Sequence, residues 1–224
     1  HGGIDAGCIS NGIMEKDIVL SIALKLGKYI KQNLDGVEVI YTRKTDRFVK
    51  LHKRAEVANK HGADVFISLH VNASQYSYVH GAETFCMGVN KSEENLKVAK
   101  RENSVVLLEE NYQKNYENFD PKSPESHILF SMQQNNNLEQ SLMLAANMQN
   151  QFDNRVKRHN RGVKQAGFVV LYQTTMPSVL VESGFLTNPN ERRYLTSDKG
   201  QTYIASGLFR AFRNYRETMN KRLN

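Results

Sequence analysis

The stretch DVFISLH, residues 64–70, carries the clearest strand signal in the chain. Its near-continuous apolar run is typical of a strand buried on both faces, as in a parallel sheet covered by helices. Before it, residues 15–34 show apolar positions at intervals of three and four, and residues 51–63 read as a second helix. This alternation of helix and strand predicts an α/β fold, in which ligands collect beyond the carboxyl ends of the strands.

Further strands are predicted at 37–41, 81–87, 167–171 and 177–181, and a closing amphipathic helix at 201–223. Residues 90–137 carry little strand signal, with charged helical sequence followed by a polar passage that contains two prolines. We therefore expect a single domain over residues 1–224, with a sheet of about six mostly parallel strands and a helical insertion at about 90–137.

The composition argues against a membrane-spanning protein and against a nucleic-acid-binding protein. The 224 residues are 40% apolar, and no window approaches 18 consecutive apolar residues, so we expect no transmembrane segment. The net charge of +7 favours an anionic partner, for which nucleic acid and the bacterial cell wall both qualify. The densest basic run lies on the closing helix without a base-reading motif, so we interpret it as a solvated face and expect no nucleic-acid partner; it comprises Arg210, Arg213, Arg216, Lys221 and Arg222.

The two cysteines, Cys8 and Cys86, lack the short spacing of a thiolate zinc site. Burial as small apolar residues is the expected role. A bridge between them stays open at this point, because an exported protein could form one.

Three residues offer the donor set of a catalytic zinc site, which commonly takes three His or carboxylate ligands and leaves one position for water. His1 precedes two glycines, Glu15 opens the first helix, and His70 ends the buried strand. Glu182 follows the apolar strand SVLV at 178–181 and should emerge at the same edge as His70. A carboxylate there could act as general base and then return the proton to the leaving nitrogen.

Each of these residues is a weak signal when taken alone. A His beside two glycines is usually a loop residue, a Glu in a first helical turn is favoured by the helix dipole, and a strand-end His is more often hydrogen-bonded than metal-bound. The prediction of a zinc site therefore depends on the occurrence of all these residues together in one chain.

The order and spacing of four motifs resemble one family. HGG at residues 1–3, EKD at 15–17, SLHVNAS at 68–74 and PSVLVESGFLTNPNE at 177–191 are similar to motifs of the zinc amidases that cleave N-acetylmuramoyl-L-alanine bonds in peptidoglycan. The resemblance implies that His1, Glu15 and His70 bind Zn2+ and that Glu182 is the catalytic carboxylate. It also implies structural roles for Arg43 and Arg54, and Asn72 is a candidate substrate contact.

The insertion resembles that of the cell-division members of this family, in which a helix covers the active site until an activator protein displaces it. Our hypothesis is that Glu94, with Glu93 and Glu102 as alternatives, occupies the open metal position and inhibits the enzyme; the alternative is that residues 92–104 form an ordinary solvated charged helix. Residues 113–126 match no part of the family pattern and are a candidate partner-binding loop. The family also places a buried strand before the ligand histidine, so we expect residues preceding His1 to supply it, in a protein exported to the periplasm or cell envelope.

Three other functions stay open on the sequence. A zinc carboxypeptidase of the cell wall would use a similar donor set, because bond choice lies in the pocket. A wall-binding module without catalytic activity would not need an open metal site. A nucleic-acid binder is motivated by charge alone.

Overall fold

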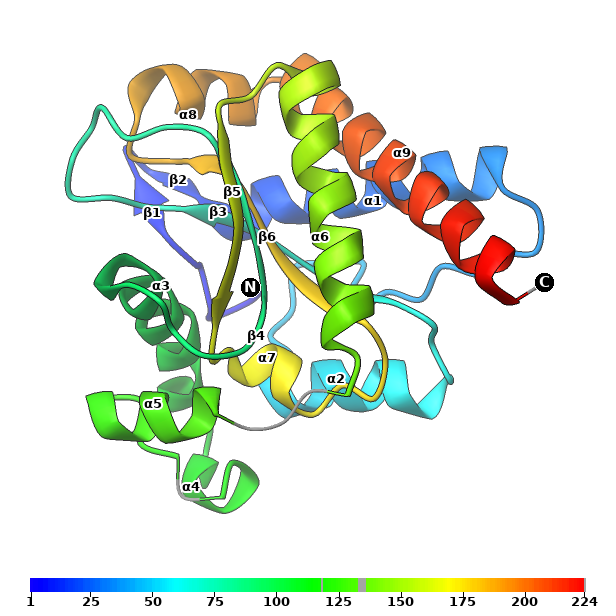
Figure 1. The fold of residues 1–224 in the computed structure, drawn as a ribbon. Helices are drawn as coiled ribbons and strands as arrows, with labels where there is room; N and C mark the ends of the chain where they lie inside the picture. Colours follow the sequence, from blue (N-terminus) through cyan, green and yellow to red (C-terminus); the bar gives the residue numbers. More distant parts are fainter. Residues whose placement is uncertain (118, 133–135, 224) are drawn as a thin grey trace.

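The computed structural model describes residues 1–117, 119–132 and 136–223 (Figure 1). Its central sheet has the strand order β3-β6-β4-β5. The β3–β6 and β4–β5 pairs are parallel, whereas β4 and β6 are antiparallel. The strands are β3 (Phe66–Asn72), β4 (Ala82–Met87), β5 (Asn160–Ala166) and β6 (Ser178–Phe185).

The α/β prediction is confirmed, and two of the three pairings in the sheet are parallel, as expected. The expected number of about six strands was only approximate. The described residues form four strands in the central sheet and a separate hairpin of two-residue strands, β1 (Ile9–Ser10) and β2 (Ile13–Met14).

Helices cover both faces of the sheet, and side-chain alternation along each strand decides which residues meet which layer. On β6, Val179 and Val181 pack into a core formed with α1 (Glu15–Asn33), α6 (Leu138–Gln151) and α9 (Asp198–Leu223). Leu180 faces the opposite core, with α2, α7 and the insertion. Those helices are α2 (Leu51–Lys60) and α7 (Val169–Tyr172), and α8 (Pro189–Thr196) follows β6.

The strand predicted at 37–41 is absent, although its residues favour β structure. The segment is extended and partly exposed, and it pairs with no strand of the described chain. A groove of about 830 Å³, lined mainly by apolar side chains, separates it from the outer edge of β3. A strand requires a hydrogen-bonded neighbour as well as suitable residues, and the groove keeps the nearest candidate out of reach.

The strand predicted at 167–171 is also wrong. Most of that range lies in α7 instead, which begins at Val169, whose N donates to Asn103 Oδ1 at 2.9 Å. The neighbouring strand is instead β5, whose polar sequence NRGVKQA carries little apolar signal. Because β5 is the last strand of the sheet, its polar residues are those of an edge strand.

The insertion is helical, as predicted, and lies against the α2 and α7 side of the sheet (Figure 1). Glu109 holds it to the domain, since its Oε1 accepts from Leu51 N at 2.7 Å. The insertion contains α3 (Glu93–Asn103), the 3₁₀ turn η1 (Ser104–Leu108), α4 (Tyr112–Asn115) and α5 (Pro124–Ser131). The candidate partner-binding loop at 113–126 falls on α4 and α5, with residue 118 outside the described part.

Both cysteines are free thiols, so no bridge joins Cys8 to Cys86. Cys86 is buried, and Cys8 is partly buried and donates its S–H to Val71 O at 3.1 Å. None of the helices in the described ranges combines the length and apolar character that a bilayer crossing requires.

Candidate metal centre and active site

Strand register brings the predicted site residues to one face of the sheet. His70 on β3 and Glu182 on β6 are register partners, and Glu182 is in turn paired with Glu83 on β4. Residues of like parity on a strand share a face, so Glu182 points to the same side as Leu180, toward α3. His70, Glu182 and Glu83 thus form a row of buried polar side chains on the face of the sheet that bears the site; we call this row the floor of the site.

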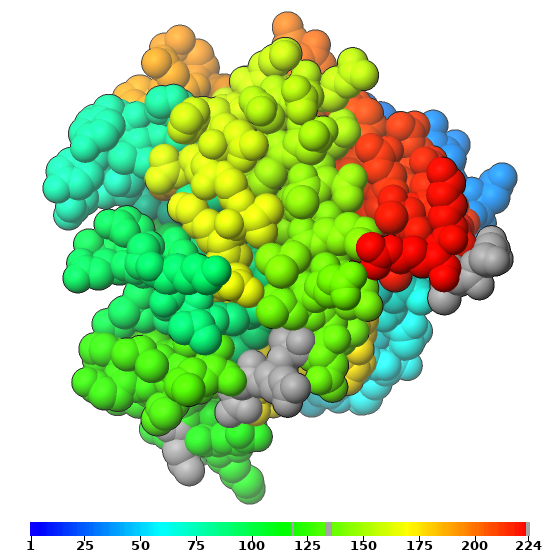
Figure 2. Space-filling model, viewed as in Figure 1, coloured from blue at the N-terminus to red at the C-terminus, as the bar shows by residue number. Residues whose placement is uncertain are grey.

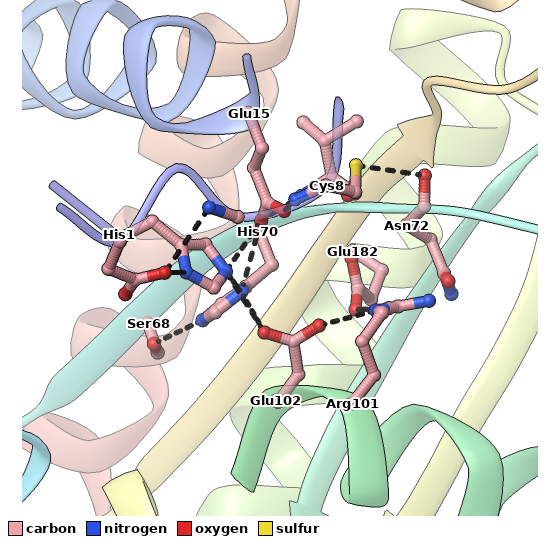
Figure 3. Close-up of polar contacts among 12 residues, drawn as sticks. His1, Cys8, Glu15, Ser68, His70, Asn72, Arg101, Glu102 and Glu182 are labelled. Atoms are coloured by element: carbon pink, nitrogen blue, oxygen red, sulfur yellow. Dashed lines mark hydrogen bonds and ion pairs between the residues drawn. The ribbon is translucent and has the colours of Figure 1, made fainter. Parts of the chain in front are cut away.

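Four side chains converge above this floor (Figure 3). His1, Glu15, His70 and Glu102 each offer one ligand atom, and the four atoms lie within 4.8 Å of one another. His1 Nε2 lies 3.1 Å from His70 Nδ1, 3.0 Å from Glu102 Oε2 and 3.2 Å from Glu15 Oε1. His70 Nδ1 lies 3.1 Å from the Glu15 oxygen and 3.0 Å from the Glu102 oxygen. All four side chains are at most 5% exposed.

The spacing of these atoms fits a small tetrahedral cation. A tetrahedron with arms of about 2.0 Å, the usual zinc–nitrogen and zinc–oxygen distance, has edges of about 3.3 Å. The five distances above are 3.0–3.2 Å. We therefore conclude that the donor set fits Zn2+, with two imidazoles and two carboxylates as ligands.

Neighbouring groups leave the required lone pairs free. Asp5 Oδ1 lies 2.6 Å from His1 Nδ1 and accepts its proton, which leaves Nε2 facing the cluster as a lone pair. His70 Nε2 lies 3.1 Å from Ser68 Oγ, so its Nδ1 faces the cluster in the same way. Arg54 forms an ion pair with the other oxygen of Asp5, with Nη2 at 3.3 Å from Oδ2.

Glu15 is fixed by backbone donors on both of its oxygens. Cys8 N donates to Oε2 at 2.9 Å, and Val71 N donates to Oε1 at 2.9 Å. Gly7 makes this approach possible, because a Cβ there would lie 2.6 Å from Glu15 Oε2, and its φ of +66° favours glycine. The carboxylate is therefore held in place before any ion binds.

The electrostatics of the cluster favour positive charge at its centre. Burial opposes ionisation, but the charge of Glu15 and the hydrogen bonds that the ring donates to Asp5 and Glu102 raise the pKa of His1 well above its usual value. Burial is likewise outweighed at Glu102, where the charges of His70 and Arg101 hold the pKa well below its usual value. The negative charges of Glu15 and Glu102 thus stabilise the protonated form of the histidines. A metal ion bound at the cluster would take the place of those protons.

The insertion residue at the cluster is Glu102 rather than Glu94, which corrects the sequence expectation. Glu94 lies in the exposed first turn of α3, and it is Glu102 that reaches the histidines. The buried residues of α3 recur at Asn95, Val98, Ala99, Glu102 and Asn103, the period of one helical face. Glu102 follows Val98 by four residues and Ala99 by three, so it lies on the same face of the helix as this apolar pair. This spacing is visible in the sequence and predicts that Glu102 faces the domain.

Glu182 lies beside the cluster, where Arg101 contacts it. Arg101 Nη2 is 3.2 Å from Glu182 Oε1, and its Nε is 2.8 Å from Glu102 Oε1. The other oxygen, Glu182 Oε2, is buried without a hydrogen-bond partner among the described residues. Burial, with the charges of Glu102, Glu15 and Glu83, raises the pKa of Glu182 well above its usual value, against the opposing effect of Arg101. A carboxylate with a raised pKa is a stronger proton acceptor than an exposed one.

The remaining sequence candidates lie close by in supporting positions. Asn72 is buried, its Nδ2 donating to Glu83 Oε1 at 2.7 Å and its Oδ1 accepting from Ala73 N. Arg43 Nη2 donates to Lys16 O at 2.6 Å, and Arg54 Nε donates to Val49 O at 2.9 Å. Both arginines thus brace backbone segments, in agreement with the structural roles that the resemblance implied.

Three participants escaped the sequence reasoning. Asp5 orients His1 and lies only four residues beyond it, a spacing that gives no signal of its own in a loop. Arg101 and Glu83 could be found only through tertiary contacts, since their neighbours in space are distant in the chain.

The fold and the site together define an α/β protein with the donor set of a metallohydrolase. The family model for N-acetylmuramoyl-L-alanine amidase matches residues 1–214. The chain therefore belongs to the N-acetylmuramoyl-L-alanine amidase family, and it is a peptidoglycan amidase.

Individual relatives agree with this assignment. N-acetylmuramoyl-L-alanine amidase AmiA of Escherichia coli K12 is 34% identical over 95% of this chain and 73% of its own length. AmiC of Escherichia coli O6:H1 is 29% identical over 96% of this chain and 51% of its own length. The crystal structure of an N-acetylmuramoyl-L-alanine amidase from Clostridium difficile 630 superposes with a TM-score of 0.71 at 28% identity, covering 97% of this chain and 92% of that one.

Proposed function

We propose that the protein hydrolyses the amide bond between N-acetylmuramic acid and L-alanine in a Zn2+-dependent reaction, for cell-wall remodelling and daughter-cell separation. The observation that carries the proposal is the convergence of His1, Glu15 and His70 at tetrahedral spacing beside Glu182. Binding a wall polymer alone would need neither the buried donor set nor an unpartnered carboxylate oxygen next to it.

Zn2+, when held by His1, Glu15 and His70, supplies Lewis-acid polarisation of the scissile carbonyl and activation of a water. Glu182 takes the proton of that water on Oε2 and passes it to the leaving nitrogen. Asp5 and Ser68 keep the two imidazoles in the tautomers that present lone pairs to the metal.

We further propose that α3 inhibits the enzyme through two consecutive residues. Glu102 fills the fourth position of the donor set, which the water and substrate need. Arg101 pairs with Glu182 and donates to Ala73 O at 3.1 Å, at the start of the loop after β3. Lifting α3 would free the metal position and the proton acceptor in one movement.

A partner protein that binds the insertion would provide this movement. The described part of the insertion exposes apolar side chains on α5 and just after it, with Leu129 69% and Met132 66% exposed and Ile128 beside them. Exposed apolar clusters of this kind mark interaction sites. One structural relative, the CwlD amidase from Clostridioides difficile, was solved in complex with the GerS lipoprotein; it is 26% identical, with a TM-score of 0.70, over 97% of this chain and 95% of that chain.

The substrate also sets the compartment. Peptidoglycan lies outside the cytoplasmic membrane, so the protein would act after export, in the periplasm or cell envelope. The surface is hollowed between the β3–β4 loop and α3, which gives a glycan strand a place to approach (Figure 2).

Product analysis tests the proposed function. Purified protein loaded with Zn2+ should release stem peptides with a free N-terminal alanine and leave bare glycan strands. Release of single C-terminal amino acids would instead indicate a carboxypeptidase, and retention of peptidoglycan without cleavage a binding module. Salt-sensitive binding to DNA without cleavage would favour a nucleic-acid binder.

A further inference from the structure

A second polar cluster lies on the same face of the sheet, on the far side of Glu182 from the metal centre. Its centre is Glu83, which is 2% exposed and is the register partner of Glu182. Glu83 Oε2 lies 2.9 Å from Arg161 Nε and 2.5 Å from Lys164 Nζ, and both of these cations come from β5. The polar row of the site thus continues across all four strands, from His70 to Arg161 and Lys164.

Arg161 and Lys164 carry more positive charge than Glu83 neutralises and more N–H donors than Glu83 accepts from. One carboxylate faces two positive side chains, which leaves an excess charge of about +1 at the cluster. Among the described residues, Arg161 donates through Nε to Glu83 and through Nη1 to His80 O, and Lys164 donates to Glu83. The side chains are 29% and 21% exposed, so their remaining N–H groups are accessible. Such donors are well suited to a carboxylate oxygen.

The position of these cations fits a substrate that extends from the scissile bond. Neighbouring strands are about 4.8 Å apart, so β5 lies about 10 Å from β6 across β4. An extended peptide advances about 3.4 Å per residue. A stem peptide whose scissile amide lies at Glu182 therefore reaches the cations within two or three residues. β5 is open to the surface between the β3–β4 loop and α6 (Figure 2).

We propose that Arg161 and Lys164 form an anion subsite that binds a carboxylate of the stem peptide. This inference rests on the proposed amidase function and adds a specificity determinant to it. Glu83 positions the two cations from below, and Asn72 positions Glu83. The helix that carries Glu102 borders the subsite, since Asn95 Nδ2 of α3 donates to Gln165 O of β5 at 3.4 Å.

The test compares two muramoyl tripeptides, one with its stem carboxylates free and the other with all of them amidated. Both substrates compete in one reaction, so the ratio of their kcat/KM values is independent of the fraction of active enzyme. The wild type should prefer the free acid by about tenfold, the size of one or two charge-assisted hydrogen bonds. Lys164→Met should reduce this preference several-fold, and adding Arg161→Met should bring the ratio close to one.

Arg155→Met is the matched control, because Arg155 is an exposed arginine six residues before Arg161. It should leave the ratio unchanged, and thermal unfolding should confirm that each variant is folded. Lys164→Met alone keeps Arg161 paired with Glu83, so it remains informative if the double variant unfolds. A preference that survives Lys164→Met, or that falls equally in Arg155→Met, overturns the subsite.

Binding of the free stem tripeptide, measured by calorimetry, separates this inference from the proposed function. The wild type should bind it several-fold more tightly than Lys164→Met does, whether or not it cleaves the muramoyl substrate. Binding without any cleavage would uphold the subsite and reject the amidase mechanism. Cleavage with equal tripeptide affinities in wild type and variant would do the reverse.

Discussion

His70 and Glu182 face each other as register partners on the parallel strands β3 and β6. One strand thus carries a candidate metal ligand and its neighbour carries the proposed proton acceptor, at a separation set by backbone hydrogen bonding. The N-terminal loop brings His1 and the start of α1 brings Glu15 to the same point, and α3 covers it with Arg101 and Glu102. In the proposed mechanism the sheet holds the reacting groups in place, and the inserted helix controls access to them.

Glu182→Gln should remove proton transfer while keeping the metal. The amide has nearly the same shape as the carboxylate but cannot accept the proton, so kcat should fall by about 10²- to 10⁴-fold. Zn2+ content, measured by elemental analysis, should stay at the wild-type value because Glu182 is not among the four converging ligands. A variant with normal turnover would reject Glu182 as general base.

Glu102→Ala should raise the activity of the isolated protein, because the fourth metal position would be open. Release of stem peptides from purified peptidoglycan measures the effect, and we expect an increase of at least about tenfold. This corresponds to a loss of about 1.4 kcal/mol in the free energy that favours the closed position of α3 over the open one. Glu94→Ala is the matched control, since Glu94 is an exposed glutamate of the same helix. Equal activities of the two variants would argue against inhibition by α3.

Asp5→Ala should weaken metal binding without removing a ligand. Asp5 holds the tautomer of His1 through its 2.6 Å contact, and loss of such a partner typically costs 10- to 100-fold in affinity. Competition with a chromophoric chelator measures this change. Asp35→Ala serves as control, because Asp35 is an exposed aspartate just beyond the C-terminal end of α1, the opposite end from Glu15. Unchanged Zn2+ affinity in Asp5→Ala would mean that His1 is oriented by other contacts.

Acidification should loosen the insertion through His127 of α5. Burial lowers the pKa of His127, aided by Lys100 and opposed by the hydrogen bond to Pro121 O and by Asp120. The neutral ring donates from Nε2 to Pro121 O and accepts at Nδ1 from Asn103 Nδ2, so a second ring proton would face another donor. Because the folded-state pKa is below the unfolded value, the stabilisation is present above about pH 6.5 and is lost as the pH falls below it.

Hydrogen exchange of α5 at pH 7 and pH 5.5, corrected for the intrinsic rate, measures this loss. The wild type should lose protection at the lower pH, whereas His127→Gln, which cannot titrate, should change less. Equal changes in the two proteins would place the pH sensitivity elsewhere.

The sequence was sufficient for the parts of the fold and site that depend on local pattern. Periodicity predicted α1 and α9, and apolar runs predicted β3 and β6. The order of short motifs singled out His1, Glu15, His70 and Glu182, which the structure brings together.

The errors arose where tertiary context decides. Residues 37–41 favour a strand but lie across a groove from β3, and β5 is a strand in spite of its polar sequence because β4 pairs with it. Glu94 was preferred to Glu102 in the sequence expectation, whereas the helical phase of Val98 and Ala99 selects Glu102. Asp5 and Arg101 become visible only when distant segments meet.

Zn2+ binding by the wild type and by His70→Ala tests the central claim most directly. The account predicts one equivalent of tightly bound Zn2+ in the wild type, with nitrogen and oxygen ligands in its X-ray absorption spectrum, and the same in the control His61→Ala, since His61 is exposed and far from the cluster. His70→Ala should lose most of this affinity together with stem-peptide release. Stem-peptide release by metal-free wild type, or undiminished Zn2+ affinity in His70→Ala, would contradict it.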